Sequence, residues 1–457
     1  MAGPAREALC AGDRPLPDAR LVNGPALTHR RVLAVAGPIV LSNVTVPILG
    51  LVDTGVIGQL GDAVPIGAVG IGAVILSTFF WVFGFLRMGT TGLTAQAHGA
   101  GRQGEVAAML TRALLIAVVA GVALITLQGP LFWAAFQVAP ASNEVETLAR
   151  DYLAIRIWGA PFAISVYAFT GWLIALERAR SVLVLQVVMN GVNIGLDLWF
   201  VLGLNLGVEG VAIATLLAEF SGAALGLWLC RDIFRNPAWR DRARVLDGPT
   251  LKNMAVVNID ILLRSLFIMA IFTSFTFYGS GLSDMELAAN QVLMQFLHVT
   301  AYAMDGFAFG AEAFVGQALG ARNRFAVRRA SVMSSMWGAG ISCTLALGFL
   351  LVGGWGIDVM TTAPDVRQVA RDFLPYMILA PLLGWPAWML DGIFIGATRT
   401  GDMRNMMILS AAIYFAAVYA LMPSLGNHGL WAALLISFVA RGATLALRYP
   451  ALERSAV

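Results

Sequence analysis

Four polar residues near the ends of otherwise apolar stretches could together bind a small cation. Asp53 closes an apolar run that begins at Leu33, and Asp197 interrupts another run. Asn193 precedes Asp197 by four residues and shares its helix face, while Thr215 lies a few residues into the next run. Counting a helical rise of about 1.5 Å per residue places Asp53, Asp197 and Thr215 at one level. The sequence therefore predicts an oxygen-rich pocket.

Such a pocket could hold sodium through its oxygen atoms, or a proton. Burial and a nearby like charge both favour the protonated form of a carboxylate. Either occupant would change the local charge and could change how the helices pack. The alternative is structural: the two aspartates would then only make hydrogen bonds, or Asp53 would end its helix in water.

A second group of charges occupies the C-terminal half. Asp260 and Arg264 are four residues apart and can pair along one helix face, and Asp305 and Asp391 lie in later apolar runs. We expect a structural ion-pair network here, with a substrate site or second proton site as the alternative. Pro38 removes a backbone donor within the first run. We expect a hinge there, although a static kink fits the sequence equally well.

Membrane-spanning helices must position these residues. The 457 residues are 58% hydrophobic and 12% charged, about half of the roughly 25% charge of soluble domains. This composition excludes ordinary soluble, disordered and fibrous proteins. A span needs about 20 apolar residues, and twelve runs qualify. They lie at roughly 33–52, 64–97, 113–138, 152–176, 181–204, 209–230, 253–280, 286–320, 330–357, 373–398, 405–423 and 429–447. The predicted fold is an all-α integral membrane protein with twelve transmembrane helices.

An internal repeat divides these helices into two lobes of six. Residues 95–100 (AQAHGA) align with 316–321 (GQALGA), 175–178 with 396–399, and 206–210 with 425–429. Because six helices separate the copies, we expect parallel repeats related by a pseudo-twofold axis along the membrane normal, as in many secondary transporters. The predicted parts are a cytoplasmic N-terminal tail (1–31), an N-lobe (32–231), a cytoplasmic linker (232–251), a C-lobe (252–448) and a cytoplasmic C-terminal tail (449–457).

The distribution of basic residues sets the orientation. Most of the 30 Lys and Arg fall on loops that share one side if both termini are cytoplasmic, for example Arg231 to Arg244. This is the positive-inside pattern, so the small basic excess reflects topology and no nucleic-acid partner is expected. The first 30 residues contain no apolar segment typical of a cleaved signal peptide.

Several motifs that would indicate other activities fail. The only lysine is Lys252, so no ATP-binding Gly-x-x-x-x-Gly-Lys-Ser/Thr motif is present. The pattern Gly99 to Gly104 matches a dinucleotide-binding fingerprint but follows a membrane helix instead of a strand. The three cysteines are far apart, and neither a paired-carboxylate motif nor a His-Glu-x-x-His motif occurs. We therefore expect neither an enzyme nor a resident metal or cofactor.

The sequence resembles the multidrug and toxic compound extrusion (MATE) transporters over residues 30–448. The resemblance rests on 51–58 (LVDTGVIG), on Pro38, Asn193 and Asp197, and on the paired Gly-Gln-Ala loops. Further matches are similar to the DinF-like branch of that family. They are 258–265 (NIDILLRS), 288–291 (AANQ) and 301–307 (AYAMDGF).

This resemblance implies a twelve-helix, two-lobe antiporter that exports bulky organic cations from a bacterium through its inner membrane. It implies Asp53 as the principal coupling acid, with Asn193, Asp197 and Thr215 around it. The coupling ion would be a proton or sodium, bound in the latter case at these four residues. We expect a monomer. In another MATE branch an acid on the seventh helix couples transport, but here Asp260 lies beside the positive charge of Arg264.

Two other functions fit the same architecture. A flippase for lipids or lipid-linked oligosaccharides would need a basic cavity, and only Arg87 and Arg264 are predicted within spans. A non-transporting membrane scaffold is compatible with the sequence. A major-facilitator carrier would show an acidic–basic glycine-rich motif after the second span, which residues 98–105 lack.

Overall fold

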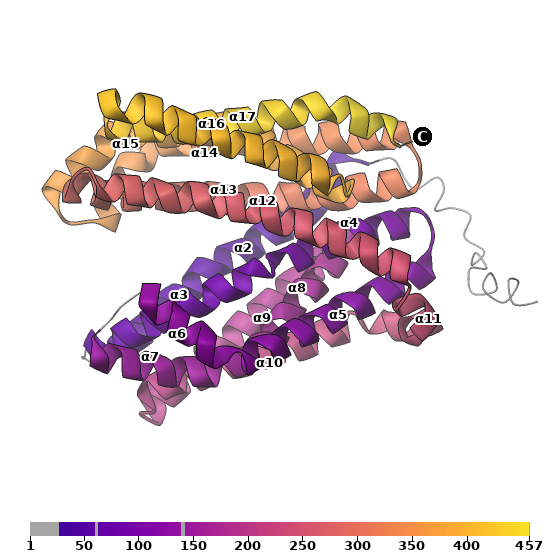
Figure 1. The fold of residues 1–457 in the computed structure, drawn as a ribbon, viewed down its shortest axis with the longest axis horizontal. Helices are drawn as coiled ribbons and strands as arrows, with labels where there is room; N and C mark the ends of the chain where they lie inside the picture. The colour runs from indigo at the N-terminus through magenta and orange to yellow at the C-terminus, as the bar shows by residue number, and fades with distance from the viewer. Residues whose placement is uncertain (1–26, 60–62, 139–141, 457) are drawn as a thin grey trace, which may run out of the picture. The chain divides into compact units, whose positions relative to one another are not determined.

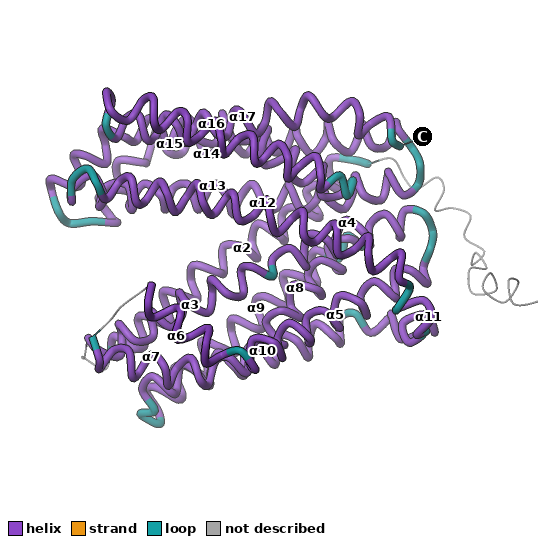
Figure 2. The backbone as a smooth tube through the Cα atoms, viewed as in Figure 1, coloured by secondary structure: helices purple, strands orange, loops and turns teal. Residues whose placement is uncertain are grey.

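The computed structural model describes residues 27–59, 63–138 and 142–456, and leaves the side chains of 46–49, 51, 53, 54 and 63 undescribed. Every regular element within these ranges is a helix (Figures 1 and 2). This agrees with the all-α fold expected from the composition. Ten helical segments in the described ranges are long and apolar enough to cross a membrane.

The N-terminal half forms six membrane-length helical segments before the linker. Their helices are α2 (His29–Gly58), α3 (Ala63–Val82), α4 (Gly84–Gly99), α5 (Gln103–Thr126), α6 (Gln128–Val138), α7 (Asn143–Arg156), α8 (Ala160–Ala175), α9 (Ala179–Asp197) and α10 (Gly207–Leu229). The helices α3 and α4 form one span, as do α7 and α8. A π-helical turn, η4 (Leu198–Gly203), extends α9.

The C-terminal half repeats this count of six. After two short 3₁₀ segments and a four-residue helix, the chain forms six long helices. The short elements are η5 (Arg231–Arg235), η6 (Pro237–Arg240) and α11 (Arg242–Val245). The long helices are α12 (Gly248–Ser280), α13 (Asp284–Gly320), α14 (Arg324–Met360), α15 (Pro364–Gly396), α16 (Thr400–Leu425) and α17 (Asn427–Arg454).

The twelve predicted spans match these twelve segments, with differences at their ends. The run expected at 113–138 is divided between two helices, because α5 runs from Gln103 to Thr126 and α6 begins at Gln128. Pro130 lies in the first turn of α6, where a proline costs no helical hydrogen bond. The segments α2 and α13 are outside the ten apolar candidates. α13 carries four acidic residues, and α2 contains most of the undescribed side chains.

The backbone confirms the internal repeat. Gly101 and Arg322 both have positive φ angles, and they are 221 residues apart (322 − 101). The pair Glu177 and Thr398 shows the same feature at the same offset (398 − 177 = 221). These residues end corresponding helices in the two halves, so the halves share turn geometry as well as sequence.

A close helix approach also repeats. A Cβ added at Gly171 of α8 would lie 2.4 Å from the carbonyl oxygen of Arg87 in α4. At Gly392 of α15, 221 residues later, it would lie 2.5 Å from the carbonyl oxygen of Ala308 in α13. Only glycine permits this contact, because any side chain would collide with backbone. The same pair of helices is therefore tightly packed in each half.

The chain divides into two compact units, one mainly from each half. The first contains Leu41–Lys252, and the second contains Asn253–Val457 together with the described residues up to Val40. The boundary thus falls within α2, whereas the sequence suggested that the N-lobe begins at residue 32. Val40 and Ala36 pack against Gly306 of α13, which explains why the start of α2 groups with the second unit.

Each unit has its own apolar core. In the first unit, residues from α3, α7 and α10 bury side chains around Tyr152 and Leu153. In the second, α13, α15, α16 and α17 surround Trp431 and Tyr414.

Candidate functional site: buried charges in each unit

The first unit buries an amide and a carboxylate together in α9. The Asn193 Nδ2 group donates a hydrogen bond to Asp197 Oδ2. The two residues are only 1% and 0% exposed. They are four apart on one helix, so the predicted shared face is observed. An isolated buried carboxylate is costly in an apolar lobe, and the amide donor offsets part of that cost.

A contact one turn away ties α9 to α2. Asn190 Nδ2 donates to Thr45 Oγ1 at 2.8 Å, and Thr45 in turn donates to the Ser42 carbonyl at 2.7 Å. Asn190 lies three residues before Asn193 and faces the same side. The polar face of α9 is therefore directed toward the helix that carries Asp53.

Of the remaining two predicted ligands, the structure describes the side chain of Thr215 only. Thr215 lies on α10, which packs along α9, but its hydroxyl donates to the Val211 carbonyl of its own helix at 2.9 Å. Asp53 lies in α2, and its side chain is outside the described residues. Asn193 and Asp197 are thus the predicted pair that the structure brings into contact.

A π-helical turn begins directly after Asp197. Leu204 N donates to the Trp199 carbonyl at 2.9 Å, a bond that spans five residues. Such turns are uncommon and often occur at functional sites. The sequence does not predict this turn, since a local change of helix type leaves no periodicity signal.

The second unit contains a buried cluster of one aspartate and two arginines. Arg264 Nη2 of α12 pairs with Asp391 Oδ2 of α15, and Arg441 Nε of α17 lies 3.7 Å from the same oxygen. All three residues are buried. The structure therefore joins the predicted Arg264 and Asp391 and adds Arg441, which had been assigned no role.

Asp260 has partners on α16. Its Oδ1 accepts from Arg404 Nη1 at 2.5 Å, and its Oδ2 accepts from Thr400 Oγ1 at 3.0 Å. Asp305 lies on α13 and interacts electrostatically with Arg441. The four predicted C-lobe residues thus take part in two charge clusters, which also involve Arg404 and Arg441.

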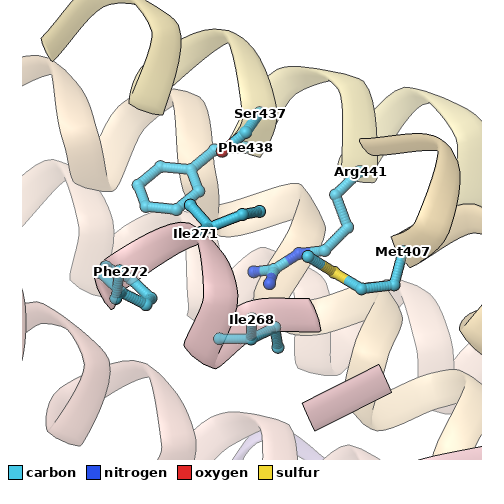
Figure 3. A pocket seen from close by; sticks show the side chains of 7 residues that line it. All are labelled: Ile268, Ile271, Phe272, Met407, Ser437, Phe438 and Arg441. Atoms are coloured by element: carbon cyan, nitrogen blue, oxygen red, sulfur yellow. The ribbon is translucent and has the colours of Figure 1, made fainter. Parts of the chain in front are cut away.

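A small cavity adjoins Arg441. It is lined by Ile268, Ile271, Phe272, Met407, Ser437, Phe438 and Arg441. Figure 3 shows the guanidinium of Arg441 turned toward Ile268 and Met407. Its volume of about 10 Å³ is close to what one water molecule needs. This cavity, as it stands, has no room for a drug-sized cargo.

The first unit also contains a buried ion pair that was not among the predicted site residues. Arg156 Nη1 of α7 lies 2.9 Å from Glu219 Oε2 of α10. A Cβ at Gly159 would lie 2.0 Å from that oxygen, so the glycine makes room for Glu219. Arg156, Glu219 and Arg441 all lie inside apolar runs of the sequence. The criterion that selected Asp197, a charge within a span, would have found them.

The donor types suit a hard monovalent cation or a proton. The side-chain oxygens of Asn193 and Asp197 are the kind of ligand that hard cations prefer. Within the described residues, no group of three or more His, Cys, Asp or Glu is placed to hold a metal ion. The charges at Arg156–Glu219 and at Arg264–Asp391 form buried ion pairs, whereas Asp197 lies beside the amide of Asn193.

Comparison with known proteins extends over nearly the whole chain. The MatE family profile matches twice, at residues 38–199 and 261–422. The chain is 39% identical over 427 residues to DNA damage-inducible protein F of Escherichia coli, which covers 90% of each protein. It is 25% identical over 467 residues to a probable multidrug resistance protein NorM of Rhizobium meliloti, covering 92% of this chain and 93% of that protein.

Solved structures share the fold. The chain resembles a MATE transporter of Vibrio cholerae with a TM-score of 0.83 at 19% identity, over 93% of this chain and 97% of that one. It resembles a MATE protein in a bent conformation with the same TM-score at 18% identity, over 97% and 100% of the two chains. The two profile matches begin 223 residues apart (261 − 38), in agreement with the repeat. The chain is therefore a two-lobe, twelve-helix member of the MATE family, in the branch that contains the DinF protein.

Proposed function

We propose that this protein exports bulky organic cations across the bacterial inner membrane in exchange for a proton or sodium ion, by alternating access. Asp197, Asn193 and Asp53 would form the ion site, with Thr215 at its edge. Occupation of that site by the small ion would favour release of cargo outside. The observation that carries the proposal is the buried Asn193–Asp197 pair on the face of α9 that meets α2.

Helix register supports a role for Asp53 at the same site. The spans of α2 and α9 are separated by three membrane-length segments, so the two helices run in the same direction. From the contact between Thr45 and Asn190, Asp53 lies eight residues further along α2, and Asp197 lies seven residues further along α9. At about 1.5 Å per residue these are rises of about 12 Å and 10.5 Å. Asp53 and Asp197 would therefore lie at one level along the two helices.

The first helix offers a means of coupling the ion to movement. Pro38 lies in α2 and removes one helical hydrogen bond. The boundary between the two compact units falls two residues later. A change in the bend at Pro38 would move the Asp53 end of α2 relative to its Pro38 end. Neutralising the carboxylates would be the event that alters the bend.

Cargo would be held mainly by burial of apolar surface, with aromatic rings adding attraction for its positive charge. The proposed orientation has both termini in the cytoplasm, because the arginine-rich ends of the spans then lie inside. The E. coli and R. meliloti relatives, both bacterial, support an inner-membrane location. We propose that the protein acts as a monomer, with no resident cofactor.

The flippase alternative requires a basic cavity, which the buried arginines would have to form. The described residues include more buried arginines than the two predicted within spans, since Arg156 and Arg441 are also buried. Arg156 has Glu219 as its carboxylate partner. Arg264 and Arg441 share Asp391, and Asp305 also attracts Arg441. Arginines that already face carboxylates do not make an anion-binding cavity, so the exporter is the better proposal.

The direct test is transport by purified protein in liposomes. We expect the wild type to move an ethidium-like cationic dye when a proton gradient or a sodium gradient is imposed, and the effective gradient identifies the ion. Asp197→Asn and Asp53→Asn should lose transport. A neutral asparagine amide cannot take up and release a proton, and it lacks the negative charge that attracts a sodium ion. The matched control is Asp151→Asn, since Asp151 is exposed on α7 and should tolerate the change. Wild-type transport by Asp53→Asn would refute the proposal.

A further inference from the structure

The linker between the two halves combines exposed arginines with exposed apolar side chains. Within η5, η6 and α11, Arg231, Arg235, Arg240 and Arg242 are exposed. Beside them, Phe234 is 45% and Leu246 is 60% exposed. A polypeptide that displays both kinds of side chain at the end of a membrane helix is suited to the interface between lipid headgroups and acyl chains.

The acidic residues of the linker each accept hydrogen bonds from nearby protein groups, and the side chains of Asp232 and Asp241 are 45% and 46% exposed. Asp232 Oδ2 accepts from Arg178 Nη2 at 2.7 Å. Asp241 caps α11 by accepting from the Ala243 amide at 3.1 Å, and Asp247 caps α12 by accepting from the Thr250 amide at 3.0 Å. These contacts lower the pKa of Asp232 and of Asp247, chiefly through the hydrogen bonds from Arg178 and Thr250 respectively. The aspartates of the linker are thus held in defined contacts, and its four exposed arginines outnumber them.

Helix α5 holds the linker in place. The guanidinium of buried Arg112 donates to the carbonyl of Val245 at 2.9 Å and to that of Arg244 at 2.6 Å. Thr111 Oγ1 donates to the Trp239 carbonyl at 2.9 Å. Figure 1 shows α11 near α5, and the Arg244 side chain lies against Gly104 at the N-terminal end of α5. The backbone that carries the arginines is therefore held in place before a ligand binds, which reduces the conformational entropy lost on binding.

Aromatic rings pack against Arg231 and Phe234 on the same surface. The guanidinium carbon of Arg231 lies 4.1 Å from the centre of the Trp228 ring, and Phe234 packs edge-on against Trp239 with 5.1 Å between ring centres. Trp228 is the penultimate residue of α10 and is exposed. Tryptophan beside arginine at a helix end is typical of the membrane interface.

We propose that the linker surface formed by Arg231, Arg235, Arg240, Arg242, Phe234 and Leu246 binds acidic phospholipids. The arginines contact the headgroup phosphates, and Phe234 and Leu246 contact the upper acyl chains. In the proposed orientation this surface lies at the cytoplasmic leaflet. Basic clusters directly after a membrane helix bind anionic lipids, with each arginine raising the affinity about fivefold at low salt.

The test measures lipid binding to the intact protein in mild detergent. Native mass spectrometry would follow titration with phosphatidylglycerol and, separately, phosphatidylcholine. We expect the wild type to prefer phosphatidylglycerol. The triple variant Arg235→Gln, Arg240→Gln, Arg242→Gln should lose roughly 100-fold in affinity for the acidic lipid and little for phosphatidylcholine. Glycerol phosphate, which has the headgroup without acyl chains, should compete poorly because it lacks the apolar contact.

A matched control removes equal charge elsewhere. Arg150, Arg367 and Arg371 lie near the opposite ends of the spans, and their triple glutamine variant should retain the preference for phosphatidylglycerol. Equal affinities of the wild type and the linker variant for phosphatidylglycerol would overturn the proposal. Equal losses of phosphatidylglycerol affinity in the two triple variants would also overturn it. Effective competition by glycerol phosphate would indicate a site for soluble phosphates and would also overturn it. Dye transport by each variant, measured in parallel, separates failure of this proposal from failure of the transport function.

Discussion

Replacing Asp391 by asparagine tests whether the C-terminal charge cluster is structural. Asp391 is the carboxylate that pairs with Arg264 and lies 3.7 Å from Arg441. All three residues are buried. Asparagine keeps the size of the side chain but leaves two buried arginines facing a neutral amide. Removing one partner of a buried ion pair costs about 3–5 kcal/mol. At roughly 2 °C per kcal/mol for large proteins, the melting temperature should fall by about 6–10 °C.

The assay is thermal unfolding in detergent, followed by size-exclusion chromatography with fluorescence detection. Asp260→Asn is the matched control. Its partner Arg404 is 33% exposed and can be hydrated after the change, so the loss should be about 1 kcal/mol. The triple variant Arg264→Met, Asp391→Leu, Arg441→Met should restore most of the stability, because apolar residues of similar size can replace a buried ion cluster. An Asp391→Asn protein as stable as the wild type would refute this reasoning.

Two further predictions concern packing and pH. Gly171→Ala should destabilise the protein by about 1–3 kcal/mol, because its Cβ would meet a carbonyl oxygen of α4 at 2.4 Å. Gly348→Ala is the control and should be neutral or slightly stabilising, because nothing lies within 4 Å of its Cβ. Thermal unfolding of both variants measures the difference, and equal stability would contradict the helix contact. The lowered pKa of Asp232 means that its bond to Arg178 stabilises the protein above the ordinary aspartate range and weakens only as the pH falls through that lowered pKa. Because Asp232 belongs to the linker, the linker should keep this contact between about pH 5 and 8. Retention of the acidic lipid by the linker should then be constant over that interval, and a marked drop within it would contradict the assigned contact.

Much of the architecture could be predicted because it depends on long apolar runs and on a repeat. Twelve spans, six in each half, follow from the apolar runs, and the repeated turns at Gly101 and Arg322 reflect a sequence match that is visible at the same offset. The break between α5 and α6 was not predicted, because the apolar run continues across it. The assignment of α2 to both compact units depends on packing against Gly306, which no local pattern reveals.

The charge clusters were only partly predictable. Spacing of four residues correctly joined Asn193 and Asp197, because both lie on one helix. Pairing between helices depends on rotation and register, which sequence spacing does not give. For that reason the partner of Asp260 was expected to be Arg264, while the structure shows contacts with Thr400 and Arg404.

The central claim is that cargo and a small positive ion compete through the carboxylates of the first unit. It can be tested by adding a lipophilic cation to purified protein in weakly buffered detergent solution while a pH indicator and a sodium electrode record ion release. We predict that the wild type releases protons or sodium on cargo binding, and that Asp53→Asn and Asp197→Asn release neither while still folded. Equal release from the wild type and from both variants would contradict the account.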